Sequence, residues 1–554
     1  MTTTAGLRSR KRDNESIHTA AEPSDKDLPN VKNIQQSTAG SRFVIFLLCL
    51  FVRLCCAWLT RTYDNPDEYW QAQEVAHRMV FGYGYLTWEW TERIRSFAHP
   101  AVFAAVYRIL AWIGAENTVI QLWAPKYFQA ILAAVADVGT YTLGKRVLGD
   151  NIAPYILYVT LVSWYNFFMA ARTLSNTMEM VLTTIALNYW PLLDTGNNAN
   201  WLKNYRIALF WASLACVMRP TNALVWFYLG IDLIVKSSNR QRYSIVVNAL
   251  LIVAAVLSAN VALDTWMYTG SLEGLFKNPI LTPVNFVRVN VINAISLLYG
   301  VHPWHWYFTQ GIPVILTTFL PFVLFGIRGR DRFTANATSA RRTLCNVTAW
   351  VLVVYSLLSH KEFRFVYPIV PILLVFAAAG LSQVPQQWKK WAILFITATQ
   401  VPMALYLSLW HQRGVMDVTL WLRSESAESI SSVGILMPCH STPWQSVIRQ
   451  PNISTWFLTC EPPLSQQDTR DYMDEADIFY DDPVDFMANQ MRGWPDRLIL
   501  FESLLDTHSK SNPSVSVSQV LEEKGYSECK RFFNSHFHDD TRRRGDVLVF
   551  CAAS

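Results

Sequence analysis

Two adjacent carboxylates, Asp67 and Glu68, follow the first long apolar run of the sequence. Acidic side chains are costly in hydrocarbon, so a pair at the mouth of a membrane-spanning segment indicates a water-filled site. A carboxylate in such a site could act as a general base that takes a proton from a substrate hydroxyl group. The alternative is an ordinary solvated acidic turn, and the composition of the segment leaves both interpretations open.

Basic side chains are concentrated in a second segment, where His360, Lys361 and Arg364 lie between two apolar runs. Arg through paired hydrogen bonds and Lys as a point charge are suited to hold a phosphate. The competing interpretation is that these residues end two spans and extend their charges toward water. Arg172 and Arg219 also lie at the ends of apolar segments, where each could bind a lipid phosphate or the free carbonyl groups of a helix end.

Aromatic and polar residues alternate in two further segments, one around Trp304 and His305 and one around Trp88 and Glu89. Aromatic side chains are enriched at membrane interfaces, so an aromatic belt is the default interpretation. The same mixture of aromatic faces and polar groups would suit sugar stacking and hydroxyl recognition. Spacing alone does not separate these two interpretations.

The elements that position these residues must be membrane-spanning helices. Of the 554 residues, 51% are hydrophobic and 16% are charged, against roughly 25% charged residues in a soluble domain. Apolar runs that approach the ~20 residues needed to cross a bilayer recur from residue 42 to residue 410. The net charge of +5 is too diluted by apolar sequence to indicate nucleic-acid binding. We expect a polytopic α-helical membrane protein with about eleven spans, at residues 42–60, 122–144, 152–170, 178–194, 205–218, 221–236, 243–263, 312–327, 346–359, 364–381 and 391–410.

The distribution of Lys and Arg predicts the orientation of these spans, because cytoplasmic loops carry an excess of both residues. The basic loops are residues 145–146, 203–206, 236–242, 328–342 and 389–390. This register places the long loop 61–121 on the opposite, luminal side, with an interfacial helix at 100–113. Residues 1–41 lack an apolar pattern and are expected to form a disordered cytosolic tail without a cleavable signal peptide.

Residues 411–554 differ in composition from the membrane region 42–410, and we expect them to form a small luminal domain. Short β-rich runs at 433–437, 454–459, 497–501 and 547–550 predict an α/β or α+β arrangement. Four cysteines in this region allow two disulfides in three possible pairings, or four buried thiols, and their spacing does not fit a zinc site. Asn452 begins a glycosylation sequon on the luminal side, whereas the sequons at Asn336 and Asn346 adjoin a cytoplasmic loop and should stay unused.

Taken together, five stretches resemble the dolichyl-phosphate-mannose-dependent α-mannosyltransferases of the endoplasmic reticulum, which have a GT-C-type fold. The stretches are residues 66–71, 172–177, 219–222, 302–307 and 360–365. Residues 436–443, 457–463 and 474–480 are similar to the luminal domain of the subfamily called glycosylphosphatidylinositol (GPI) mannosyltransferase III. Asn65 departs from the pattern, since many family members have His before the Pro-Asp-Glu sequence.

The resemblance implies transfer of the third mannose, in α1,2 linkage, from dolichyl-phosphate-mannose to a mannosylated GPI precursor in the lumen of the endoplasmic reticulum. The donor is β-linked and the product α-linked, so the reaction inverts the anomeric carbon and needs a base and a site for the departing phosphate. Asp67 is the expected base, with Glu68 as its neighbour or substitute. The expected phosphate ligands are His360, Lys361, Arg364, Arg172 and Arg219, and the expected sugar or acceptor ligands are Trp304, His305, Trp88 and Glu89. We expect no obligatory divalent metal or other cofactor, although Asp67 and Glu68 could hold a metal ion.

Other functions remain open at this stage. Another luminal mannosyltransferase could elongate a dolichol-linked oligosaccharide or add a fourth GPI mannose. A lipid transporter usually contains inverted repeats, and the sequence has no internal repeat. A noncatalytic scaffold would not depend on Asp67. The expected partners are the two lipid substrates and the membrane, and the sequence identifies no protein partner.

Overall fold

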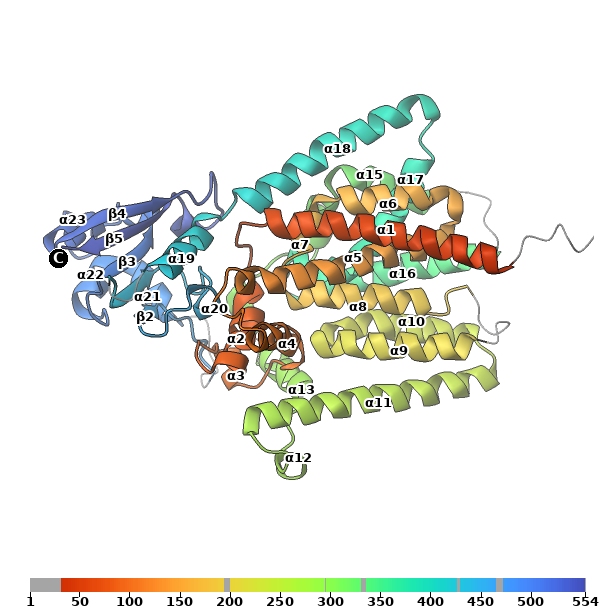
Figure 1. Ribbon diagram of the computed structural model, residues 1–554, viewed down its shortest axis with the longest axis horizontal. Coiled ribbons are helices and arrows are strands. Elements are labelled where there is room, and N and C mark those ends of the chain that lie inside the picture. The colour runs from red at the N-terminus through yellow and green to blue at the C-terminus, as the bar shows by residue number, and fades with distance from the viewer. Residues whose placement is uncertain are drawn as a thin grey trace, which may run out of the picture. The chain divides into compact units, whose positions relative to one another are not determined.

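The computed structural model describes residues 31–193, 200–293, 295–329, 335–425, 429–464 and 472–553. Most of the membrane region consists of helices that run roughly parallel to one another in Figure 1. Their bounds are α1 Val31–Leu59, α5 Ile120–Leu148, α6 Ala153–Val162, α7 Trp164–Met169, α8 Ser175–Tyr189, α9 Trp201–Met218, α10 Ala223–Lys236, α11 Asn239–Thr269, α14 Ile312–Leu316, α15 Leu320–Arg328, α16 Ala335–Leu357, α17 Val370–Ser382 and α18 Gln386–Leu409.

Five helical segments within the described residues are long and apolar enough to cross a membrane. They are Gly40–Leu59, Asn239–Thr269, Tyr307–Arg328, Phe363–Ser382 and Gln386–Ser424. The other predicted spans coincide with helices that are shorter or more polar, so the number of about eleven spans stays a prediction. Helix α1 begins at Val31, earlier than the predicted border at residue 42. Most of the predicted tail, residues 1–30, lies outside the described residues.

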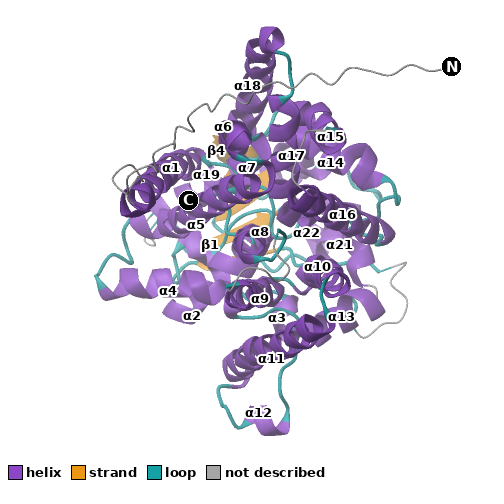
Figure 2. Cartoon of the chain, turned by 90° about the vertical axis from the view of Figure 1, so that its right-hand side faces the viewer, coloured by secondary structure: helices purple, strands orange, loops and turns teal. Residues whose placement is uncertain are grey.

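Helix α17 forms the centre of the membrane region. Its side chains are almost all buried, and Figure 2 shows it surrounded by other helices, whereas α11 and α18 lie at the periphery. The crossing of α15 and α17 requires two glycines. A Cβ atom on Gly326 would lie 1.8 Å from the Phe376 carbonyl oxygen, and one on Gly380 would lie 1.9 Å from the Phe322 carbonyl oxygen. Small residues of this kind allow membrane helices to approach at backbone distance.

A buried ion pair joins two of the membrane helices. Arg53 on α1 donates from Nε to Asp137 Oδ2 on α5 at 2.6 Å, and the two side chains are 1% and 6% exposed. Arg53 also donates to the Thr160 carbonyl oxygen of α6 at 3.1 Å. Charged groups in hydrocarbon are rare and are nearly always paired in this way.

The long first loop folds into short helices at one end of the membrane helices (Figure 1). It contains a π-helical turn at Tyr69–Gln73, then α2 at Glu74–Phe81, α3 at Trp88–Thr91 and α4 at Ala98–Trp112. Helix α4 confirms the helix predicted at 100–113. Smaller helices occupy the loop that follows α11, at α12 Gly274–Lys277 and α13 Thr282–Val287.

The carboxyl-terminal region contains a five-stranded mixed sheet in the order β2-β1-β3-β5-β4. Strand β1 pairs in parallel with β2 and β3, and β5 pairs antiparallel with β3 and β4. The strands are β1 Ser432–Leu436, β2 Ser454–Phe457, β3 Arg497–Phe501, β4 Tyr526–Phe532 and β5 Val547–Ala552, and the helices are α19 Gly414–Ser424, α20 Gln445–Ile448, α21 Glu475–Asp481, α22 Pro483–Asn489 and α23 Val517–Glu523. Disulfides join Cys439 to Cys460 and Cys529 to Cys551, which is one of the three pairings that the sequence allowed.

Candidate active site

Asp67 lies in a tight turn that leads into the helices of the first loop. The side-chain oxygen Oδ1 of Asn65 accepts a hydrogen bond from the Asp67 backbone N–H at 3.0 Å, and the Asn65 carbonyl oxygen accepts from the Glu68 N–H at 3.1 Å. Asn stabilises such turns because its short side chain can bind the backbone two residues further on. The residue that departs from the family pattern therefore has a structural role of its own here.

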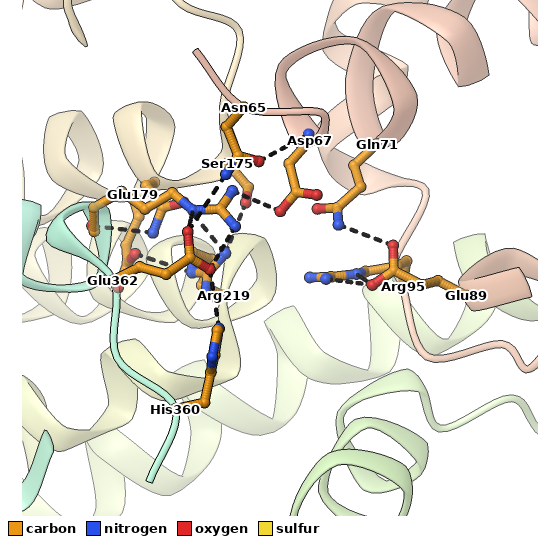
Figure 3. A network of polar contacts seen from close by, with 12 residues as sticks. Asn65, Asp67, Gln71, Glu89, Arg95, Ser175, Glu179, Arg219, His360 and Glu362 are labelled. Carbon is orange, nitrogen blue, oxygen red and sulfur yellow. Dashed lines mark hydrogen bonds and ion pairs between the residues drawn. The ribbon is translucent and has the colours of Figure 1, made fainter. Parts of the chain in front are cut away.

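Asp67 and Glu362, which belong to the two sequence clusters, both take part in one network of polar contacts (Figure 3), and Arg364 connects them. Its Nη1 donates to Asp67 Oδ2 at 2.5 Å, while Nε and Nη2 donate to the two oxygens of Glu362 at 2.6 and 2.8 Å. His360 Nε2 lies 3.1 Å from Glu362 Oε1 on the other side. Asp67 and Arg364 are 297 positions apart in the sequence. The two segments thus form one chain of charges, which runs from Asp67 through Arg364 and Glu362 to His360.

The charges in this chain stabilise one another. Burial tends to raise the pKa of Glu362, but Arg364 and His360 lower it by more, so this carboxylate is ionised at neutral pH. Burial tends to lower the pKa of His360, but the hydrogen bond and the charge of Glu362 raise it above its usual value. The cationic form of His360 is therefore favoured, and with Arg364 it supplies positive charge beside Asp67.

Glu68 does not take part in this chain. Its side chain has no exposed surface, and it is paired with Arg172, whose Nη1 donates to Glu68 Oε2 at 2.7 Å. Arg172 also donates to Thr62 Oγ1 and to the carbonyl oxygens of Thr62 and Phe168. The expectations that Glu68 can substitute for Asp67 and that Arg172 binds phosphate are thus not supported, because both groups are buried and engaged with each other.

Lys361 also differs from the expectation. Its Nζ donates to the carbonyl oxygen of His302 at 3.0 Å and to that of Leu358, and the residue is 2% exposed. The ammonium group thus binds two backbone carbonyl groups and is buried, so it also does not extend toward water as the competing interpretation expected. Of the three basic residues in this cluster, His360 and Arg364 are the two that reach the carboxylates.

Arg219 is linked to the same network through Asn176, which also binds the Arg364 carbonyl oxygen. It follows α9, and its Nε lies 3.4 Å from Glu179 Oε2, while Nη1 donates to Ser175 Oγ and Asn176 Oδ1. Arg219 and Arg364 lie over the ring of Phe365, at 5.4 and 5.9 Å from its centroid. Both guanidinium groups thus lie around one ring, and their combined positive charge favours an anion nearby.

Glu89 lies across from this network in Figure 3, next to an arginine that the sequence analysis did not select. Arg95 donates to Glu89 Oε1 from Nε at 3.0 Å and from Nη2 at 2.6 Å, and Gln71 Nε2 donates to Glu89 Oε2 at 2.8 Å. Trp88, expected to contact a sugar, is instead 7% exposed and packs among apolar residues of the loop that follows α11. The Trp88 ring therefore belongs to a small apolar core between the first loop and the loop that follows α11.

Trp304 and His305 are exposed, and among the described residues neither contacts Asp67, Arg364, Glu362 or His360. Trp304 is 67% exposed, and His305 pairs with Thr309 Oγ1 at 3.2 Å. The aromatic residue of this segment that touches the site is Tyr307, which is buried and donates from its hydroxyl to the Glu362 carbonyl oxygen at 3.1 Å. The expectation that Trp304 and His305 bind a sugar stays a prediction.

Sequence reasoning missed Glu362, Arg95 and His99. Glu362 stands between Lys361 and Arg364 in the basic cluster, so its position in the motif was a usable signal. His99 on α4 is buried, its Nε2 has no partner among the described residues, and burial lowers its pKa to about 3, with Arg219 and Arg95 adding to the shift. Neither Arg95 nor His99 belongs to a pattern that could have shown where the folded chain places it.

One group of possible metal ligands occurs among the described residues. Cys439, His440 and Cys460 offer ligand atoms within 4.8 Å of one another. Their two sulfur atoms are bonded to each other, however, and a disulfide cannot supply the thiolates that a metal requires. The expectation of a reaction without an obligatory metal stays a prediction.

Comparisons of this sequence with known proteins all point to one family of mannosyltransferases. A family model described as the Alg9-like mannosyltransferase family matches residues 44–449. GPI mannosyltransferase 3 of Yarrowia lipolytica is 38% identical over 94% of this chain and 99% of the relative. GPI alpha-1,2-mannosyltransferase 3 of Homo sapiens is 36% identical over 90% of this chain and 85% of the relative.

Solved structures support the fold. ArnT from Cupriavidus metallidurans, crystallised with undecaprenyl phosphate, aligns with a TM-score of 0.54 at 10% identity, covering 93% of this chain and 98% of that one. The oligosaccharyltransferase of Archaeoglobus fulgidus aligns with a TM-score of 0.51 at 11% identity, covering 88% and 72%. The architecture is therefore that of GT-C membrane glycosyltransferases.

Proposed function

Because this chain belongs to the Alg9-like mannosyltransferase family, we propose that it adds the third mannose, in α1,2 linkage, to the GPI precursor. The proposal is supported by relatives named for this step that match over nearly the whole length of both chains. The donor is dolichyl-phosphate-mannose and the acceptor is a two-mannose GPI lipid. The structural observation that carries the mechanism is the contact between Asp67 and Arg364.

Asp67 is the proposed general base. Arg364 binds only its Oδ2, and among the described residues no other side chain binds Oδ1, which is free to accept a hydrogen bond from the acceptor hydroxyl. In the reaction, the acceptor oxygen forms a bond to the anomeric carbon and its proton moves to Asp67. The bond from the anomeric carbon to the phosphate oxygen breaks, and its electron pair stays on the phosphate. Attack from the face opposite the phosphate converts the β-linked donor into an α-linked product.

The departing dolichyl phosphate is stabilised by positive charge. We assign this role to Arg364, which contacts the base, to His360, which is linked to Arg364 through Glu362, and to Arg219, which lies over the same Phe365 ring as Arg364. Fixed cations that are positioned before the reaction stabilise developing negative charge without reorganisation. Because these side chains supply the positive charge, we expect activity to persist after treatment with a chelator such as EDTA.

The proposed location is the membrane of the endoplasmic reticulum, with the amino terminus in the cytosol and both the active site and the carboxyl-terminal region in the lumen. The donor and the acceptor are lipids that share this membrane. The positive-inside distribution of Lys and Arg supports this orientation.

The decisive experiment measures the GPI intermediates in microsomes that lack the endogenous activity. With the wild-type chain, a two-mannose intermediate should be converted to a three-mannose species. Asp67→Asn keeps the shape of the side chain but removes the base, and should lower the rate at least about 10²-fold at equal protein abundance. An unchanged two-mannose intermediate with the wild-type chain would refute the proposal, and dolichol-linked oligosaccharides would then be examined.

A further inference from the structure

The carboxyl-terminal region makes several buried contacts with the first loop, close to Asp67. Trp70 is 2% exposed, and its Nε1 donates to the carbonyl oxygen of Thr442 at 3.0 Å. Its ring packs against His440 with centroids 4.3 Å apart and against Phe457 at 5.1 Å. Trp444 stacks on the same ring at 6.1 Å. A side chain of the first loop is thus enclosed by aromatic residues of the carboxyl-terminal region.

Two further side chains of the first loop bind the same segment. The Tyr63 hydroxyl donates to the His440 carbonyl oxygen at 2.6 Å. The buried carboxylate of Glu74 accepts from the backbone N–H of Gln445 at 3.2 Å and from that of Ser446 at 2.8 Å. Residues on both sides of Asp67 in the sequence therefore hold one stretch, residues 440–446.

Trp70 is also bonded directly to the turn that carries Asp67. Its backbone N–H donates to the Pro66 carbonyl oxygen at 2.9 Å, and the Tyr69 N–H donates to the same oxygen at 3.0 Å. Asp67 follows Pro66, so a displacement of Trp70 moves the peptide that precedes the base. An error of about 1 Å in the position of a catalytic group can cost about 10²-fold in rate.

From these contacts we propose that the carboxyl-terminal region positions the catalytic turn through Trp70. In this proposal, the disulfide between Cys439 and Cys460 fixes residues 440–446, which contact Trp70. Cys439 precedes His440, which has a left-handed backbone with φ of 56°, and Cys460 follows Phe457 by three residues. The two flanks of the Trp70 site thus belong to one closed loop. The inference rests on the proposed function, because it concerns the geometry of its base.

The chain contains a matched control for this disulfide. The bond between Cys529 and Cys551 closes a loop with a sequence separation of 22, against 21 for Cys439 and Cys460. The two bonds therefore restrict the unfolded chain to nearly the same extent. Cys529 and Cys551 join the edge strand β4 to β5. Cys551 lies at the border of the apolar cluster that contains Trp70, but neither cysteine belongs to the loop between Cys439 and Cys460 that encloses Trp70.

The test compares the double variants Cys439→Ser/Cys460→Ser and Cys529→Ser/Cys551→Ser in the full-length chain in microsomes. The first should lower kcat at least about tenfold while KM for dolichyl-phosphate-mannose stays within about twofold. The second should keep kcat when rates are normalised to folded protein. Equal loss of kcat in both variants would overturn the proposal, because the disulfide would then contribute only to stability.

Trp70→Phe keeps the test decisive if the first double variant does not fold. Phe retains an aromatic ring but loses the Nε1–H bond to Thr442. We expect kcat to fall at least about threefold with KM for the donor unchanged, and Trp70→Ala to be more severe. A Trp70→Phe enzyme with wild-type kcat would refute the positioning role. A wild-type chain without mannosyl transfer would refute the proposed function itself.

Discussion

At the scale of single residues, the two neighbouring carboxylates have different environments. Asp67 is 20% exposed and binds a guanidinium that also holds Glu362. Glu68 has no exposed surface and neutralises Arg172, with Lys126 Nζ 4.0 Å away. A partly exposed carboxylate can meet a substrate, whereas Glu68 is shielded from solvent and balances the charge of Arg172. We therefore expect Asp67 to act in the chemistry and Glu68 in the stability of the fold.

This division predicts the effect of Glu68→Gln. The substitution leaves Arg172 buried without its counter-charge, which typically costs about 3–5 kcal/mol. We expect a lower thermal midpoint and reduced protein abundance, as measured by unfolding in detergent and by immunoblotting, while transfer per folded molecule falls far less than in Asp67→Asn. If Glu68→Gln were normally stable but inactive, Glu68 would have a role in the chemistry.

Arg364→Lys tests the bridge between the carboxylates. Lys has a single ammonium group and cannot form the paired bonds to Glu362 while also reaching Asp67. We expect kcat/KM to fall about 10²-fold in the microsomal assay. Arg531→Lys is the matched control, because Arg531 also binds two carboxylates, Glu528 and Glu502, but on the exposed surface. A similar loss in the control would show that the effect is not specific to the site.

Among the helices and strands, the sequence predicted the ones whose residues follow a clear hydrophobic pattern. Four of the five strands lie in predicted β-rich runs, and α4 lies where an interfacial helix was expected. Strand β4 was missed because most of its residues are polar and exposed, so it shows no alternation. The pairing of Asp67 with Arg364 could not be predicted either, since nothing in one sequence records which residues 297 positions apart meet. The buried partners of Lys361 and Arg172 could not be predicted for the same reason, although the charge of both residues was visible in the sequence.

The contact between the first loop and the carboxyl-terminal segment should weaken in acid. Burial lowers the pKa of His440 to about 4, with Asp67 opposing the shift and Arg543 adding to it. Below pH 6.5 this histidine binds a proton in the unfolded chain, whereas folded His440 stays mostly neutral until the pH approaches 4. The free energy of unfolding therefore falls as the pH drops from 6.5 toward 4. At pH 5 the loss is about 2 kcal/mol.

Thermal unfolding of wild type and His440→Gly at pH 7.5 and pH 5 checks this prediction. Gly adopts the left-handed backbone at this position without strain and does not titrate. His77 and His99, whose pKa values burial lowers to about 3, also add to the acid sensitivity and remain in both proteins. The variant should therefore lose only part of the pH dependence, and an identical pH dependence would contradict the role of His440.

At the scale of the whole molecule, the proposed orientation can be read from glycosylation. Asn452 is exposed and precedes β2, whereas Asn346 lies within helix α16. We expect endoglycosidase treatment to shift the protein by one glycan, and the shift to be absent in Asn452→Gln but present in Asn346→Gln. A shift that persists in Asn452→Gln would place another sequon in the lumen.

The ion pair between Arg53 and Asp137 has a consequence for biosynthesis. The two residues are 84 positions apart, so at ~5–20 residues per second their synthesis is separated by about 4–17 seconds. During this interval Arg53 has no carboxylate partner, and an arginine at the centre of an inserting helix costs about 2.5–3.5 kcal/mol. The first helix is therefore expected to wait beside the translocon until α5 emerges, so that the two helices leave it together as a neutral pair.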